Sequence, residues 1–201
     1  MLSIRILLVG NSVPLYLDIH DSLANVIRIT PKEIQSINYD CRRVLISDGC
    51  CNDIEYTTFD FSRFYNVEEI IIGNDCFENV DTFVVNRLNT LKSLKIGDRS
   101  FSRIKSVDDW DYDRVKNDCM YRFQISNCNE LESIEIGRFS FVTFNDNFVL
   151  QNLPKLATIK IGSIESDISK SNNWGWSANF AFASFVVEGM IDIDSIITRS
   201  S

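Results

Sequence analysis

The chain has few of the residues on which most enzymes and metal sites depend. Its 201 residues include one histidine, His20, and its six cysteines contain no C-x-x-C pair of the kind that binds zinc. Neither a G-x-S-x-G nucleophile motif nor an H-E-x-x-H motif occurs. The sequence therefore predicts a protein that is not an enzyme, with no catalytic residues, no bound metal and no cofactor.

Positive charge is also scarce. Lys and Arg number 20 against 28 Asp and Glu, which gives a net charge of -8 and a pI near 4.7. Nucleic acids and anionic membranes require concentrated Lys and Arg, and no basic cluster occurs. The first apolar run, IRILLVG, is too short to span a bilayer. We expect no nucleic acid partner and no membrane insertion.

Export signals are missing as well. No small-residue cleavage site follows the first apolar run, and no Asn-x-Ser/Thr acceptor for N-glycosylation occurs. The expected location is therefore the cytoplasm. An extracellular surface is the alternative if the sequence is a trimmed or partial chain.

What the chain does contain is a repeat. One phrase consists of an apolar residue, two variable residues, an apolar residue, one variable residue, Ile and Gly, and it ends at Gly73, Gly97, Gly137 and Gly162. A second phrase begins upstream at Phe59, Phe83, Phe123, Phe148 and Phe185. Gly73 and Gly97 lie 24 residues apart, and the longer interval of 40 to Gly137 is one period plus an insertion. Repetition at this period is typical of solenoids.

The apolar spacing within a unit predicts two short strands. Spacing of two, as in Phe83 and Val85, indicates a strand with one buried face, and spacing of three indicates a tight connection. Strands are expected at Phe83 to Val85 and at Ser93 to Ile96, and the glycine after the second strand is expected to need positive φ or close backbone approach. The predicted fold class is a β-rich solenoid of about 24-residue coils with two short parallel ladders.

The pattern resembles the leucine-rich repeats of the BspA-like subclass. Leu91, Leu94, Ile96, Gly97 and Phe101 carry the resemblance, as an L-x-x-[LI]-x-I-G-x-x-x-F phrase. It covers the chain from about Arg43 to the C-terminus and is strongest from Phe59 to Ile161. The resemblance implies recognition of partners through the solenoid surface and supplies no catalytic residues.

The first 40 residues do not fit the repeat. They contain two apolar alternations, Ile4 to Val9 and Val26 to Ile29. Because an uncovered solenoid end would leave strand edges open, we predict that residues 1–40 form a β-rich cap. Residues 41–201 are the predicted solenoid, with insertions at 105–121 and 163–179.

The two predicted ladders differ on their outward sides. In the second ladder Ile71, Lys95, Glu135 and Lys160 would stack, and Glu68, Lys92 and Glu132 would form a parallel row, so that charges alternate between neighbours. In the first ladder the outward row is Asp60, Val84, Gln124, Val149 and Val186, with Thr58, Thr82 and Arg122 beside it. This uncharged, β-branched row is the better candidate contact face, although simple β-propensity also explains it.

The insertions hold every tryptophan of the chain. Trp110 lies in the first beside Tyr112, and Trp174 and Trp176 lie in the second. Aromatic residues on repeat insertions often carry recognition, while packing over the adjoining core is the alternative that we favour. Asp109, Asp111 and Asp113 alternate as in a calcium loop, but the rest of that pattern is missing, so a solvated acidic loop is preferred.

The sequence thus predicts a non-catalytic interaction module with a protein partner. The candidate binding residues are Val84, Gln124, Val149 and Val186 on the first ladder and Trp110, Tyr112, Trp174 and Trp176 on the insertions. The alternative is a surface or adhesive module whose aromatic loops stack on glycan or host matrix.

Overall fold

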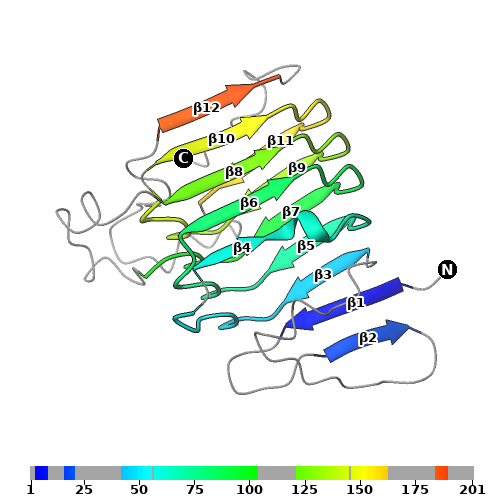
Figure 1. Cartoon of the computed structure of the whole chain (residues 1–201), viewed down its shortest axis with the longest axis vertical. Helices are drawn as coiled ribbons and strands as arrows, with labels where there is room; N and C mark the ends of the chain where they lie inside the picture. The colour runs from blue at the N-terminus through cyan, green and yellow to red at the C-terminus, as the bar shows by residue number, and fades with distance from the viewer. Residues whose placement is uncertain are drawn as a thin grey trace, which may run out of the picture.

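The computed structural model describes residues 3–8, 16–20, 42–55, 57–103, 121–144, 146–162 and 184–189. These residues are rich in β-structure, and among them only Phe61–Arg63 (η2) form a helical turn. The strands form two sheets that lie against each other (Figure 1). In the part of the chain described, no helix is long and apolar enough to cross a membrane.

Sheet A has seven strands in the order β11-β9-β7-β5-β3-β1-β2, and sheet B has five in the order β12-β10-β8-β6-β4. The strands of sheet A are β1 (Ser3–Leu8), β2 (Tyr16–His20), β3 (Arg43–Ile46), β5 (Glu69–Ile72), β7 (Ser93–Ile96), β9 (Ser133–Ile136) and β11 (Thr158–Ile161). Those of sheet B are β4 (Thr58–Asp60), β6 (Thr82–Asn86), β8 (Arg122–Ser126), β10 (Asn147–Gln151) and β12 (Ser184–Glu188).

From β3 onward the strands alternate between the two sheets along the chain, and each pairs in parallel with the strand two places later. Equivalent residues of the sequence repeat are direct partners: Ile72 pairs with Ile96, Ile96 with Ile136, and Ile136 with Ile161. The prediction of a β-rich fold with parallel strands in two sheets is confirmed, and the arrangement is compatible with a solenoid.

Phenylalanines fill the space between the sheets in two columns. In one column Phe123 stacks on Phe83 and on Phe148, with ring centroids 5.2 Å and 4.7 Å apart. In the other, Phe101 stacks on Phe77 and Phe141 at 4.8 Å and 4.6 Å. The two columns meet edge to face, as aromatic rings prefer. Buried side chains therefore alternate with more exposed ones along strands such as β5, β6 and β10.

The repeated glycine is required mainly by close backbone approach. A Cβ on Gly97 would lie 2.6 Å from the carbonyl carbon of Gly73, and one on Gly137 would lie 2.4 Å from that of Gly97. The positive φ angles fall two residues later, at 55° for Asp75 and 54° for Arg99. Of the two reasons that the sequence left open, close approach applies to Gly73, Gly97 and Gly137, and positive φ to Gly162, at 111°.

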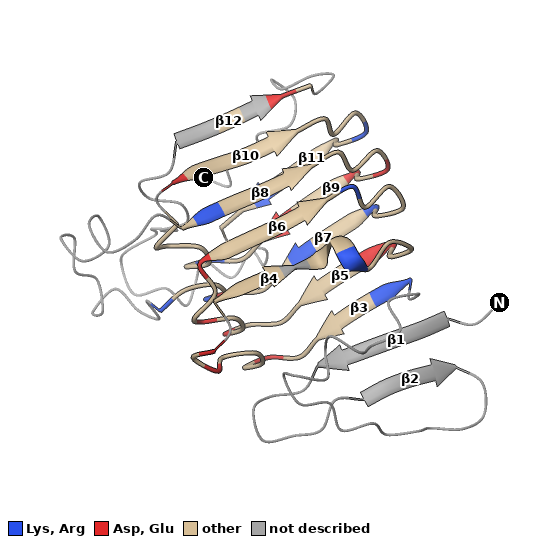
Figure 2. Cartoon of the chain, viewed as in Figure 1, with Lys and Arg blue, Asp and Glu red and all other residues tan. Residues whose placement is uncertain are grey.

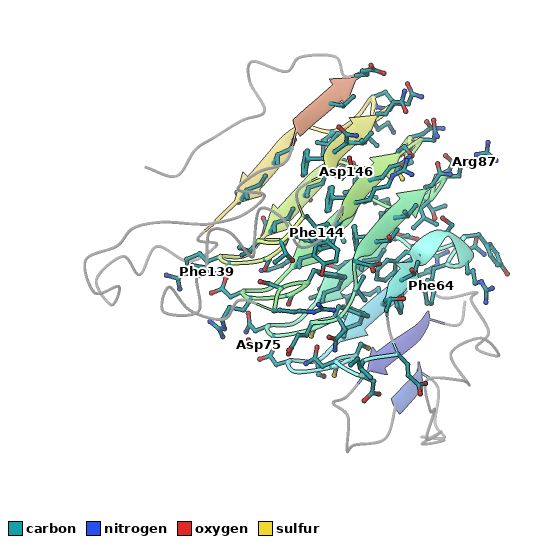
Figure 3. The ribbon with its side chains drawn as sticks, turned by 60° about the vertical axis from the view of Figure 1, so that its left-hand side comes forward. Phe64, Asp75, Arg87, Phe139, Phe144 and Asp146 are labelled. Carbon is teal, nitrogen blue, oxygen red and sulfur yellow. The ribbon has the colours of Figure 1, made fainter. Side chains whose placement is uncertain are left out.

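A ladder of side-chain oxygens joins the turns after β3, β5, β7 and β9. The backbone N–H of Asn74 donates to Asp48 Oδ1 at 2.7 Å, that of Asp98 to Asn74 Oδ1 at 2.7 Å, and that of Arg138 to Asp98 Oδ1 at 2.8 Å. Figure 3 shows Asp75 at this edge of the molecule, Arg87 projecting from the opposite edge and Phe144 between the sheets. Each turn is thus bonded to the turn before it.

At the N-terminal end, β1 extends sheet A by pairing in parallel with β3, and β2 pairs antiparallel with β1. The first predicted alternation, Ile4 to Val9, overlaps β1, and β2 occupies a segment for which no strand was predicted. The second alternation, Val26 to Ile29, lies outside the described residues.

Candidate interaction surface

The outward side of sheet A is covered by ion pairs. Ile71, Lys95, Glu135 and Lys160 are successive register partners, as the alternation along the strands predicted. Glu135 lies between two lysines, with its carboxylate 3.8 Å from Lys95 Nζ and 3.2 Å from Lys160 Nζ. Both lysines of this row therefore share one carboxylate, Glu135.

A second row of sheet A behaves in the same way. Glu68 accepts hydrogen bonds from Arg42 Nη1 at 2.8 Å and from Lys92 Nζ at 3.0 Å. The hydrogen bond from Lys92 is the main cause that lowers the pKa of Glu68 below its ordinary value, and the charges of Lys92 and Arg42 add to it. Arg43 and Glu69 form a further pair between β3 and β5. In both rows, charged side chains of neighbouring strands are joined in ion pairs.

The outward side of sheet B is largely uncharged, and we call it the sheet B face. Figure 2 shows β6, β8 and β10 mostly in the colour of uncharged residues, with charge gathered at strand ends and turns. Because the inward residues Phe83, Phe123 and Phe148 lie in the core, their neighbours along each strand face outward. The sheet B face consists of Thr82, Val84, Asn86, Arg122, Gln124, Ser126, Asn147, Val149, Gln151, Val186 and Glu188.

The middle row of the sheet B face brings together the predicted ladder residues. Val84 pairs with Gln124, Gln124 with Val149, and Val149 with Val186. All four side chains are partly exposed. At the parallel-strand spacing of about 4.8 Å, the row is roughly 14 Å long. The predicted neighbours of this row follow the same register, with Thr58 opposite Thr82 and Thr82 opposite Arg122.

A hydrogen-bond chain that the sequence did not reveal crosses this face. Arg122 Nη2 donates to Gln124 Oε1, and Gln124 Nε2 donates to Ser126 Oγ at 3.0 Å. Ser126 Oγ donates to Asn86 Oδ1 at 3.1 Å, and Asn127 Nδ2 donates to the same oxygen at 3.0 Å. Two strands, β6 and β8, and the turn after β8 thereby hold these polar side chains in fixed orientations.

Further hydrogen bonds between side chains lie toward the C-terminal end of sheet B. Asn152 Nδ2 donates to Asn127 Oδ1 at 2.9 Å, and Gln151 Nε2 donates to Glu188 Oε2 at 3.0 Å. Asn127 and Asn152 both have φ near 55°. The amide groups therefore form a continuous polar border beside the valine row.

The other predicted binding residues, Trp110, Tyr112, Trp174 and Trp176, lie outside the described residues. Around the two predicted insertions, the described residues end at Arg103 and resume at Tyr121, the last residue of the first insertion, and they end at Gly162 and resume at Ser184 for the second. Tyr121 is buried and contacts Phe144 with ring centroids 5.5 Å apart. This residue, included in the predicted first insertion, belongs to the core.

The four cysteines among the described residues belong to the core or pack against it. Cys50, Cys51, Cys76 and Cys128 are all free thiols, and three of them are buried. Burial raises the pKa of both Cys76 and Cys128 to about 11, and it also raises that of Cys51. Within the described ranges no three His, Cys, Asp or Glu side chains are grouped to hold a metal ion.

Comparison of the chain with protein-family models, with curated proteins and with solved structures found no match.

Proposed function

We propose that the chain is a leucine-rich repeat solenoid of the BspA-like type and acts as a non-catalytic interaction module that binds a protein partner on the sheet B face. The in-register partners Ile72, Ile96, Ile136 and Ile161 support the repeat assignment. The stacked Phe77, Phe101 and Phe141, which recur at one place in the repeat phrase, support it as well.

The observation that carries the binding proposal is the contrast between the outward rows of the two sheets. On sheet A the acid Glu135 is paired within its own row. On the sheet B face Val84, Val149 and Val186 are partly exposed, uncharged and aligned across neighbouring strands. Protein interfaces exclude charge from their centres and place polar groups around the rim, which matches a valine row bordered by amides.

Site-specific photo-crosslinking in the native source tests the proposal. A photoreactive phenylalanine replaces Val149 in one variant and Lys95 in a matched variant on sheet A. The expected result is a discrete crosslinked protein with the Val149 variant, competed away by excess unmodified chain, and none with the Lys95 variant. Equal crosslinking from both positions would contradict the proposal.

A glycan array distinguishes a glycan partner from a protein partner. Binding to a glycan array, lost in Val149→Arg and without any protein crosslink, would support the glycan alternative in place of a protein partner.

For the predicted aromatic contacts, alanine variants of Trp110, Trp174 and Trp176 distinguish two roles. Loss of binding with unchanged melting supports recognition, whereas loss of stability supports packing.

A further inference from the structure

Arg122 differs from every other residue of the sheet B strands. It is the only Lys or Arg in the five strands TFD, TFVVN, RFQIS, NFVLQ and SFVVE. Its side chain is exposed, at the amino end of β8, and its register partner on β6 is the uncharged Thr82. A single cation therefore lies beside the valine row, in which the register partner of Val84 on β4 is the acid Asp60.

Within the described part of the chain, the guanidinium of Arg122 donates one side-chain hydrogen bond and has further N–H donors that meet no acceptor. Its Nη2 donates to Gln124 Oε1, and Gln124 is itself held by Ser126 and, through it, by Asn86. A guanidinium carries five N–H donors in a planar fork, so this single bond orients the group and leaves donors for a ligand. Preorganisation of this kind reduces the entropy lost on binding.

The chemistry of the free donors indicates an anionic acceptor. A guanidinium fork matches a carboxylate, which accepts two parallel hydrogen bonds. A phosphate polymer needs several cations in a row, and the sheet B strands provide one. Because the whole chain has a net charge of -8, a strongly acidic protein would be repelled, which limits the acid to one side chain or a C-terminus in a neutral or basic partner.

We infer that the partner places one carboxylate on Arg122 and an adjacent apolar group on the valine row at Val84 and Val149. This inference rests on the proposed function and adds the chemistry of the partner. The two contacts are separated by two residues along β8 and one strand to either side, which suits an acidic residue close to an apolar one in the same segment. Arg is also among the residues that most often dominate binding energy at interfaces.

A random-peptide library displayed on phage and selected on the intact wild-type chain tests the inference. We expect the selected peptides to be enriched in Asp or Glu beside an apolar residue. Affinity should fall about tenfold to a hundredfold on Arg122→Gln, the range for a hydrogen bond to a charged group, and less on Arg122→Lys, which keeps the charge without the fork. Lys95→Gln on sheet A is the matched control and should bind as the wild type does.

The outcomes separate this inference from the proposed function. Three results would overturn the carboxylate contact. The selected peptides could lack an acid, they could bind Arg122→Gln as tightly as wild type, or they could bind no better than background. If Val149→Arg still abolishes binding in those selections, or if Val149 still yields its protein crosslink, the sheet B face remains the interaction surface. If Val149→Arg has no effect on the binding of the selected peptides and Val149 yields no crosslink, both the carboxylate contact and the proposed function are contradicted. The melting temperature of each variant is measured to check that its fold is retained.

Discussion

The two outward faces of this molecule share a core and a strand spacing but differ in how their side chains are paired. On sheet A, Glu135 lies between Lys95 and Lys160, so the row is satisfied internally. On sheet B, Val84 and Val149 flank the uncharged Gln124, and the acid of that row, Asp60, is the register partner of Val84 on β4. The backbone fixes where the rows lie, and the residues in them decide whether a row binds itself or remains available to another molecule.

The largest expected effect comes from the core on which both faces depend. Phe123 is fully buried and stacks on Phe83 and Phe148. Phe123→Ala should lower the free energy of unfolding by about 3 to 5 kcal/mol, through lost burial and the cavity left behind. Urea unfolding followed by circular dichroism measures it, with Phe123→Leu as the milder control. An unchanged midpoint would contradict a core common to the two faces.

The next effect concerns the spacing between neighbouring turns. Gly97→Ala would place a Cβ 2.6 Å from the Gly73 carbonyl carbon, so we expect a loss of about 2 to 3 kcal/mol as the strands are pushed apart. The matched control is Gly49→Ala, where a Cβ meets nothing within 4 Å and only the φ of 71° opposes it, at about 1 kcal/mol. A larger loss of stability at Gly49 than at Gly97 would show that backbone conformation, and not close approach between neighbouring turns, is the reason for glycine.

A direct comparison of the faces places the same residue in each. Glu135→Lys would put three lysines side by side and should cost about 1 kcal/mol, less at high salt. The register partners of Val149, Gln124 and Val186, are uncharged, so for Val149→Lys we expect a loss of no more than about 0.5 kcal/mol that salt leaves unchanged. Thermal melting at two salt concentrations measures both. Equal salt dependence would remove the distinction between the faces.

The smallest expected effect is the pH response of the sheet A ion pairs. Because the hydrogen bond and charge of Lys92 hold the pKa of Glu68 below its ordinary value of 4.5, the pair stabilises the fold fully above that value. This stabilisation should be lost as the pH falls through the lowered pKa. The difference in unfolding free energy between wild type and Lys92→Met should therefore shrink from pH 6 to pH 3. A difference that stays constant would mean that Glu68 and Lys92 are not coupled.

Much of the architecture could be predicted because a repeat states the same spacing several times. The alternation of Phe83 with Val85 and of Leu94 with Ile96 placed two strands per unit and assigned their inward sides. The outward rows followed from the same alternation, including Val84, Gln124, Val149 and Val186. Period-two patterns carry this information because every second side chain shares a face.

Other features depend on contacts that spacing does not encode. The strand β2 reads YLDIH, in which Leu17 and Ile19 alternate with Asp18 and His20, but a pattern this short does not specify the antiparallel pairing with β1, which is set by the tertiary structure. Positive φ at Asp75 and Arg99 has no residue signature, since neither is a glycine. The hydrogen-bond chain from Arg122 to Asn86 depends on register and rotamers together, which only the folded chain specifies.

The oxygen ladder along the turns makes the length of the molecule adjustable. Asn74 donates its backbone N–H to the preceding turn and accepts from Asp98 in the following one, so the 24 residues from Asn74 to Gly97 begin and end with matching chemistry. A tandem copy of this module would find the same side-chain acceptor before it and the same backbone donor after it, and it would add one strand to each sheet. Arg138, which donates but cannot accept at its side chain, closes the ladder among the described turns and so limits such growth to the modules before it.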